Sequence, residues 1–301
     1  VRGEFPFFWI GASLMGISNG FAIFYRFAAA DAVEPEWRGR AISYVLAGGL
    51  AAAFIGPELG VLTKDLLAPA TFAGCYAVLV GIALLKMAVL SNLRFPLPTV
   101  EERTAPGRPL LEIIAQPHYL IALVCSMVGW GVMILIMSST PLAMQVCNLG
   151  FNDTAFVIQW HVVGMYAPSF FTGHLIRRFG LPKILFMGAV LQAAAITVNL
   201  TGIEVWNFLA ANLLVGMGWN FLFVGGSTLL TTTYRVEERA RAQGVHDLLT
   251  MGVAAIAAFG SGALHYLVGW QFVNIAVIPL IVCVLVANLW KRYTPTPVAT
   301  E

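Results

Sequence analysis

Hydrophobic residues fall into nine long runs separated by shorter polar connections. The runs cover residues 6–30, 41–60, 70–90, 118–139, 153–175, 183–201, 204–231, 245–267 and 271–290. An α-helix of about 20 apolar residues crosses the hydrocarbon core of a bilayer, and most runs reach or exceed that length. The pattern predicts an all-α polytopic membrane protein with nine transmembrane helices.

The composition excludes a water-soluble globular protein. Hydrophobic residues make up 59% and charged residues 11% of the 301-residue chain, against roughly 45–50% and about 25% in soluble domains. The mean hydropathy of +0.81 means that one buried core cannot hold all the apolar side chains. The lysines and arginines are spread over short connections, and the net charge is only +2, so nucleic acid is not an expected partner.

The sequence contains no pattern typical of an enzyme, a metal site or a disulfide framework. No HExxH or GxSxG motif and no paired Cys-x-x-Cys is present, and we expect neither an enzyme nor a cofactor or metal. The four cysteines are isolated in or beside apolar runs, which is typical of buried thiols. They are Cys75, Cys125, Cys147 and Cys283.

Positive charges concentrate in every second connection. The opposite connections 140–152, 202–206 and 264–270 contain no Lys or Arg, and only Lys64 interrupts the alternation. Positively charged loops stay on the cytoplasmic side, which places residue 1 outside and the C-terminus inside, in a bacterial cytoplasmic membrane. The positive residues are Arg38 and Arg40, then Lys86, Arg94, Arg103 and Arg108, then Arg177, Arg178 and Lys183, then Arg235, Arg239 and Arg241, and finally Lys291 and Arg292.

One long polar connection divides the helices into a group of three and a group of six. It spans 92–117 and contains five prolines, which resist helix formation because each lacks a backbone donor. We therefore expect two helix bundles, at 1–91 and 118–292, joined by a cytoplasmic linker at 92–117 and followed by a cytoplasmic tail at 293–301.

The chain repeats itself at an offset of 201 residues. That offset aligns residues 38–41 (RGRA) with 239–242 (RARA), and it pairs Asn19 with Asn220. One offset that matches both a loop and the helix before it indicates duplicated halves. Because the helices of 118–201 would map before residue 1, we expect the first half to lack three helices, about 85–100 residues at 20 per span plus loops.

Three segments resemble motifs of the major facilitator superfamily. Residues 172–180 (TGHLIRRFG) resemble the gating motif between helices eight and nine through Gly173, Arg178 and Gly180, with Arg177 where the family has an acid. Gly56, Pro57 and Gly60 resemble the tail of the antiporter motif of helix five. Residues 236–244 (VEERARAQG) resemble the loop between helices ten and eleven.

The resemblance implies a fold and a function. The fold would be two six-helix bundles, of which this chain holds helices four to twelve. The function would be secondary active transport of a small organic solute by alternating access, coupled to protons, in a monomer surrounded by lipid. The alternative is a truncated or non-transporting membrane protein of the same fold, and we expect residues 1–301 alone not to move solute.

Polar side chains within the apolar runs are the candidates for solute or proton binding, because burying them in a membrane is costly. His161, near Gln159 and Tyr166, is either a histidine bonded to a neighbouring carbonyl or a substrate contact and proton acceptor. Arg26 either extends to the headgroups or faces the interior and pairs with a carboxylate or an anionic group. Asp247, after His246, either caps a helix or takes part in proton coupling.

Amides and indoles form the second set of candidates. Asn19 and Asn220 either bond between helices, at about 0.6 kcal/mol, or bind substrate, since the resemblance implies that their helices line the central cavity. Trp130 either forms an aromatic wall of that cavity or simply packs, and Trp219, beside Asn220, is a further candidate for substrate binding.

Overall fold

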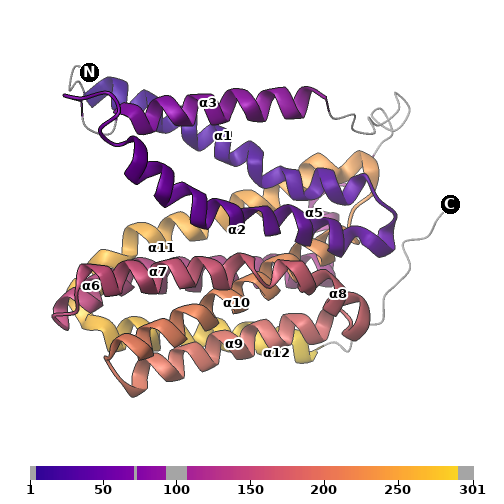
Figure 1. Ribbon diagram of the computed structural model, residues 1–301. Helices are drawn as coiled ribbons and strands as arrows, with labels where there is room; N and C mark the ends of the chain where they lie inside the picture. Colours follow the sequence, from indigo (N-terminus) through magenta and orange to yellow (C-terminus); the bar gives the residue numbers. More distant parts are fainter. Residues whose placement is uncertain (1–4, 71–72, 93–106, 291–301) are drawn as a thin grey trace.

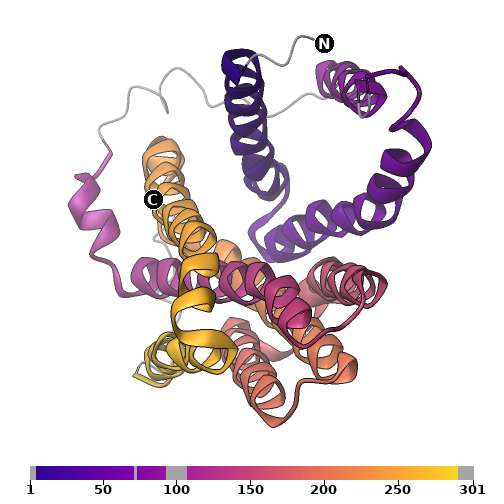
Figure 2. The same ribbon diagram turned by 90° about the vertical axis from the view of Figure 1, so that its left-hand side faces the viewer.

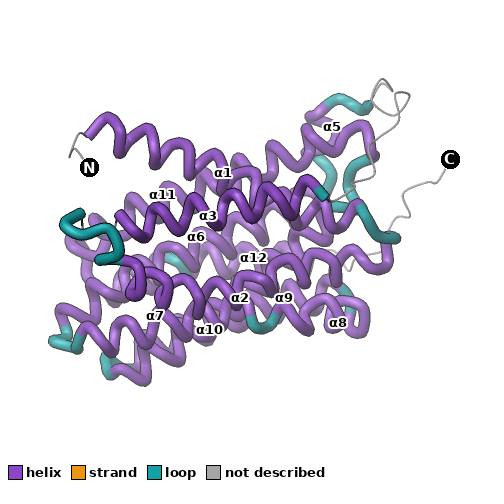
Figure 3. Tube along the Cα trace, turned by 45° about the horizontal axis from the view of Figure 1, so that its top comes forward, coloured by secondary structure: helices purple, strands orange, loops and turns teal. Residues whose placement is uncertain are grey.

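The computed structural model describes residues 5–70, 73–92 and 107–290. Within these ranges all regular structure is helical, and Figure 3 shows the helices joined by short loops. The all-α architecture is therefore confirmed. Most of the predicted linker, with Arg94 and Arg103, lies outside the described residues, as do Lys291, Arg292 and the predicted tail at 293–301.

Three helices match the first three hydrophobic runs. They are α1 (Phe5–Asp31), α2 (Arg38–Thr63), which follows the short turn η1 (Pro35–Trp37), and α3 (Ala73–Ser91). The helix α2 packs against both α1 and α3. Figure 1 shows these three helices on one side of the molecule. We call them the N-terminal group.

The remaining helices form a second group around α10. They are α5 (Leu110–Ile114), α6 (Pro117–Val146), α7 (Phe151–Tyr166), α8 (Ser169–Phe179), α9 (Leu181–Thr201), α10 (Val205–Leu230), α11 (Arg239–Ala276), which follows η2 (Val236–Glu238), and α12 (Ile278–Trp290). The helix α10 packs against α6, α7 and α9, while α11 packs against α6 and α12 against α9 and α6. Figure 2 shows most of these helices gathered on the side opposite the three indigo and purple N-terminal helices. We call α6 to α12 the C-terminal group.

Proline divides one predicted helix, and glycine marks the boundary between two others. The run 153–175 is divided into α7 and α8 at Pro168, which cannot donate a helical hydrogen bond. The helix α11 is interrupted at Gly269, whose φ of +78° is non-helical and suits glycine, and helix then resumes up to Ala276. The predicted boundary between the runs 245–267 and 271–290 coincides with this interruption, and a second break follows before α12 begins at Ile278.

Six helical stretches in the described ranges are long and apolar enough to cross a bilayer. The breaks account for part of the difference from the nine runs, because α7 and α8 are each short and α11 and α12 form one stretch. The six stretches are Pro35–Gly60, Ala73–Ser91, Pro117–Val146, Leu181–Thr201, Val205–Leu230 and Val236–Asn288.

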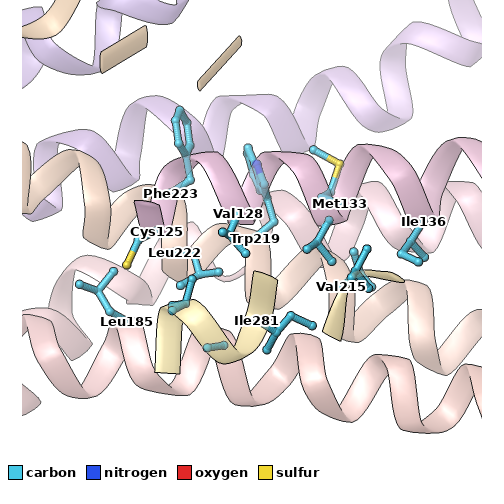
Figure 4. Close-up of a cluster of buried hydrophobic side chains, with 14 of the residues drawn as sticks. Cys125, Val128, Met133, Ile136, Leu185, Val215, Trp219, Leu222, Phe223 and Ile281 are labelled. Carbon is cyan, nitrogen blue, oxygen red and sulfur yellow. The ribbon is translucent and has the colours of Figure 1, made fainter. Parts of the chain in front are cut away.

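The core lies between α6, α9, α10 and α12. Figure 4 shows Leu185, Leu222 and Ile281 packed on one side of α10, while Trp219 and Phe223 extend from its other side toward the N-terminal group. The helix α10 therefore carries an aliphatic face for the core of its own group and an aromatic face for the contact between groups.

Candidate functional site

Arg26 lies near the end of α1 and joins the two helix groups. Its side chain is 1% exposed, and its Nη2 lies 2.6 Å from Oδ1 of Asp247 on α11. Its Nε donates to Ser227 Oγ on α10 at 3.1 Å, and its Nη1 donates to the carbonyl of Ile23 at 2.5 Å. Of the two predicted orientations, the interior one that pairs with a carboxylate is observed.

Asp247 is the acidic partner of this cluster and does not cap a helix. Because α11 begins at Arg239, Asp247 lies two turns inside it, which corrects the capping interpretation. The carboxylate also lies 2.9 Å from Nδ1 of His246, whose Nε2 lies 3.1 Å from Ser126 Oγ on α6. The His246 ring therefore lies between Asp247 and Ser126 and links α11 to α6.

An aromatic layer continues from the ion pair along α10. The rings of Trp219 and Phe223 are stacked with centroids 5.2 Å apart, and Trp130 of α6 meets Trp219 edge-on at 5.1 Å. Tyr166 of α7 extends the layer, with its ring 5.8 Å from Trp219. The guanidinium of Arg26 lies over Phe223, 4.5 Å from the ring centroid. We call Trp130, Tyr166, Trp219 and Phe223 the aromatic layer.

Several buried polar atoms beside the layer and the ion pair have no protein partner. These atoms are the indole nitrogens of Trp130 and Trp219, Oδ2 of Asp247 and the hydroxyl of Thr250. Leaving such groups unpaired costs about 1–3 kcal/mol each. A solute with flat rings and a polar edge could stack on the layer and pair these donors and acceptors. The arrangement therefore fits the binding of a planar, polar-edged molecule.

The other predicted polar residues have separate surroundings. His161 is buried, with Nδ1 2.7 Å from the carbonyl of Asn212 on α10. Asn220 donates to the carbonyl of Met165 at 2.7 Å and accepts from Thr172 at 2.7 Å, so it bridges the break between α7 and α8. Both geometries are those of helix-to-helix hydrogen bonds. Asn19 and Gln159 lie exposed on α1 and α7.

At one end of the molecule, an arginine from each helix group contacts the other group. Nη1 of Arg239, at the start of α11, lies 2.9 Å from Oδ2 of Asp31 at the end of α1. In return, Nη1 of Arg38, at the start of α2, donates to the carbonyl of Thr231 after α10 at 3.1 Å. The two arginines are 201 residues apart, the offset of the internal repeat. We call this the arginine-rich end.

The predicted gating motif lies at the arginine-rich end. A Cβ atom on Gly173 would lie 2.6 Å from Arg40 Cα, so α8 and α2 touch through their backbones there. Gly180 ends α8 with a φ of +88°. Arg178 lies over the ring of its neighbour Phe179, whereas Arg177 reaches the ring of Trp37 in the other group.

The predicted helix-five motif shows no comparable packing. A Cβ atom on Gly56 or Gly60 would meet no atom within 4 Å, and the helix α2 continues through Pro57. No close helix contact therefore requires glycine at these two positions in the described part of the chain.

The described end of the linker is attached to the C-terminal group. Arg108 forms a bidentate contact with Glu238, with Nη2 2.7 Å from Oε2 and Nε 2.8 Å from Oε1. The hydrogen bond with the Glu238 carboxylate raises the pKa of the Arg108 guanidinium. This contact holds the turn before α11 in place, next to Arg239.

Sequence reasoning missed three members of the cluster. Ser227 lies 201 residues after Arg26, and the repeat offset could have identified it. Ser126 and Phe223 lie in apolar runs that give no local signal, because a single hydroxyl or phenyl group there is unremarkable until helix packing is known.

Comparisons with known proteins agree with the helical arrangement. The family model described as Major Facilitator Superfamily matches residues 148–301. The riboflavin transporter RfnT of Brucella anthropi is 38% identical over 300 residues, which cover 99% of this chain and 75% of that protein. The uncharacterized MFS-type transporter YddS of Bacillus subtilis is 26% identical over 260 residues, or 81% of this chain and 59% of that protein.

A solved structure has the same fold. The crystal structure of a bacterial homologue of the iron transporter ferroportin, in the outward-facing state, matches with a TM-score of 0.64 and 15% identity over 87% of this chain and 66% of that chain. The relatives and the membrane-spanning helices identify an integral membrane protein of the transporter type, not an enzyme. The chain belongs to the major facilitator superfamily.

Proposed function

We propose that this protein transports a planar, polar-edged aromatic solute of the flavin class across a bacterial cytoplasmic membrane. The observation that carries the proposal is the aromatic layer, which runs directly into the buried Arg26–Asp247 pair between the two helix groups. A similar protein named a riboflavin transporter supports the flavin class. Arg26, Trp130, Tyr166 and Trp219 are the proposed solute contacts.

Alternating access is the proposed mechanism. The N-terminal group and the C-terminal group would move against each other about the solute, as two rocking halves. The alternation of positive charge along the sequence supports placing the arginine-rich end on the cytoplasmic side. The crossed contacts of Arg38 and Arg239 would then hold that side closed, and they would break when it opens.

Removal of the central indole is expected to weaken flavin transport. In protein expressed from its complete gene in cells that cannot take up riboflavin, Trp219→Leu should raise the KM for riboflavin uptake about 3- to 10-fold, because one aromatic contact is lost. Trp219→Phe should retain most of the affinity. Trp206→Leu, at a 68% exposed indole on the same helix, is the control and should match the native KM. Absence of saturable riboflavin uptake, or equal effects at both positions, would contradict the proposal.

We infer that Asp247 is the site at which a proton is coupled to transport. The titratable and charged groups around it are Arg26 of α1, His246 of α11 and Tyr119 of α6, and Ser227 of α10 joins through Arg26. Protonation of Asp247 would remove the charge that holds Arg26, so α1 and α11 could separate. His161 is bonded to a carbonyl within one helix group, which makes it the weaker candidate.

Transport driven by a pH gradient separates these two candidates. Asp247→Asn should abolish the dependence of riboflavin accumulation on an imposed pH gradient, because an amide cannot take up the proton. His161→Ala should retain the native ratio between uptake with and without the gradient. Gradient dependence that persists in Asp247→Asn, or that disappears in His161→Ala alone, would show that the coupling site lies elsewhere than Asp247.

A further inference from the structure

The guanidinium groups of two arginines lie over the ring of Trp37 at the arginine-rich end. The centre of the Arg40 guanidinium is 4.5 Å from the Trp37 ring centroid, and that of Arg177 is 4.4 Å from it. Trp37 and Arg40 belong to the N-terminal group, whereas Arg177 comes from α8 of the C-terminal group. The Arg177–Trp37 contact therefore crosses the boundary between the groups.

We propose that Arg177 and Trp37 form a cation–π latch that holds the arginine-rich end closed, in place of an acidic contact at this motif position. The inference rests on the proposed alternating access, since a latch matters only if this end opens. A guanidinium over an indole face is favourable within about 6 Å of the centroid, and both distances are shorter than that.

The local backbone positions Arg177 over the ring. Gly173 lies one helical turn before Arg177 on the same face of α8, and its lack of a side chain lets α8 touch the backbone of Gly39 and Arg40. This contact brings the next turn of α8 to the level of η1, where Trp37 lies. The motif glycine and the unusual arginine thus act on the same surface of the N-terminal group.

The charges around the latch explain why an arginine is tolerated there. Arg40 shares the Trp37 ring with Arg177, and Arg38 and Glu36 line the same cavity as Arg177. The three guanidinium groups would repel one another, and one carboxylate offsets only part of that repulsion. The electron-rich faces of one indole attract the guanidinium groups of Arg40 and Arg177. Trp37 therefore makes a positively charged contact surface compatible with closure.

The helix groups are not tightly packed beside the latch. The Arg177–Trp37 contact therefore contributes measurably to the stability of the closed state. A cavity of about 250 Å³ lies between the groups, lined by Glu36, Arg38, Arg177 and Thr228 among others. Trp37 itself is 41% exposed. A cation–π contact at an exposed site is modest, so the latch biases the equilibrium between closed and open states and does not lock it.

The test measures the distance across this end by pulsed electron paramagnetic resonance. One spin label is placed at Glu34 of the N-terminal group and one at Lys183 of the C-terminal group, both exposed positions. The protein is expressed from its complete gene, and its native cysteines are first replaced so that only these two positions are labelled. The cysteines include Cys75, Cys125, Cys147 and Cys283. Arg177→Ala and Trp37→Ala should each raise the long-distance population about two- to five-fold. The double variant should show no larger effect than either single one, and Trp37→Phe and Arg177→Lys should stay close to native.

Two variants make the result decisive. Arg178→Ala removes an equal charge from a side chain that stacks within its own helix, and it should leave the distance distribution unchanged. Arg177→Gln removes the charge but keeps a planar polar end group, and it should open this end about as much as alanine. A native distance distribution in Arg177→Gln, additive effects in the double variant, or an equal effect of Arg178→Ala would overturn the latch. The distance measurement needs no solute. The latch proposal can therefore be tested even if the protein does not transport riboflavin.

Discussion

Arg26→Ala is expected to lower the free energy of unfolding by about 3–5 kcal/mol and to abolish transport. The substitution leaves the carboxylate of Asp247 buried without its cationic partner, and breaking one side of a buried ion pair costs that much. Ser227 also loses the donor that Arg26 supplies to its hydroxyl. Reversible denaturation of the protein from its complete gene, in bicelles, measures the loss, and riboflavin uptake measures the activity.

A double variant separates the unpaired charge from the lost packing. Arg26→Ala with Asp247→Ala removes both charges, so it should recover part of the stability lost in Arg26→Ala while transport remains absent. Lys86→Ala is the control, because Lys86 donates to Ser18 at 2.9 Å within the exposed part of the N-terminal group. It should change stability by less than about 1 kcal/mol. A loss in Arg26→Ala no larger than in Lys86→Ala would contradict a structural role for the buried pair.

Hydropathy alone predicted most of the helices because lipid demands long apolar segments whatever their neighbours. It placed the helix ends less well, since these depend on single residues. Pro168 divides one run into two helices, and the run 271–290 is divided again before Ile278. The misplaced start of α11 led directly to the capping interpretation of Asp247, because a residue two turns inside a helix is not near its terminus.

The partners within the site depend on helix packing, which composition does not encode. Arg26 is compatible with both headgroups and interior until α11 is placed beside α1. His161 and Asn220 were candidate ligands, yet His161 contacts a backbone carbonyl of α10 and Asn220 bonds to backbone and hydroxyl groups of α7 and α8. Trp37 lies in a connection, outside the apolar runs in which polar candidates were sought.

The interface of α7 and α10 is a place where an added side chain should have a large effect. A Cβ atom on Gly216 would lie 2.7 Å from the carbonyl oxygen of His161 and 2.8 Å from the nitrogen of Met165. Gly164 faces the same interface from α7, where a Cβ atom would lie 2.7 Å from the carbonyl oxygen of Leu213. These are backbone atoms, so the helices themselves must move apart to accept a side chain.

Gly216→Val is therefore expected to cost about 3 kcal/mol of stability, the upper part of the usual range for overpacking, and to weaken flavin binding as well. Separation of α7 from α10 would lengthen the bond from His161 to Asn212 and the contact between Tyr166 and Trp219. Denaturation in bicelles measures the stability, and equilibrium binding of riboflavin to the purified protein measures the affinity.

Gly260→Ala is the control for this prediction, because a Cβ atom there would meet nothing within 4 Å. Alanine is favoured over glycine inside a helix by about 0.5–1 kcal/mol, so this variant should be slightly more stable than the native protein. A loss of stability in Gly216→Val together with a gain in Gly260→Ala would show that the contact between α7 and α10 causes the loss. Equal changes in stability at the two positions would mean that glycine acts only through helix propensity. The close approach of α7 and α10 would then not determine the position of the aromatic layer.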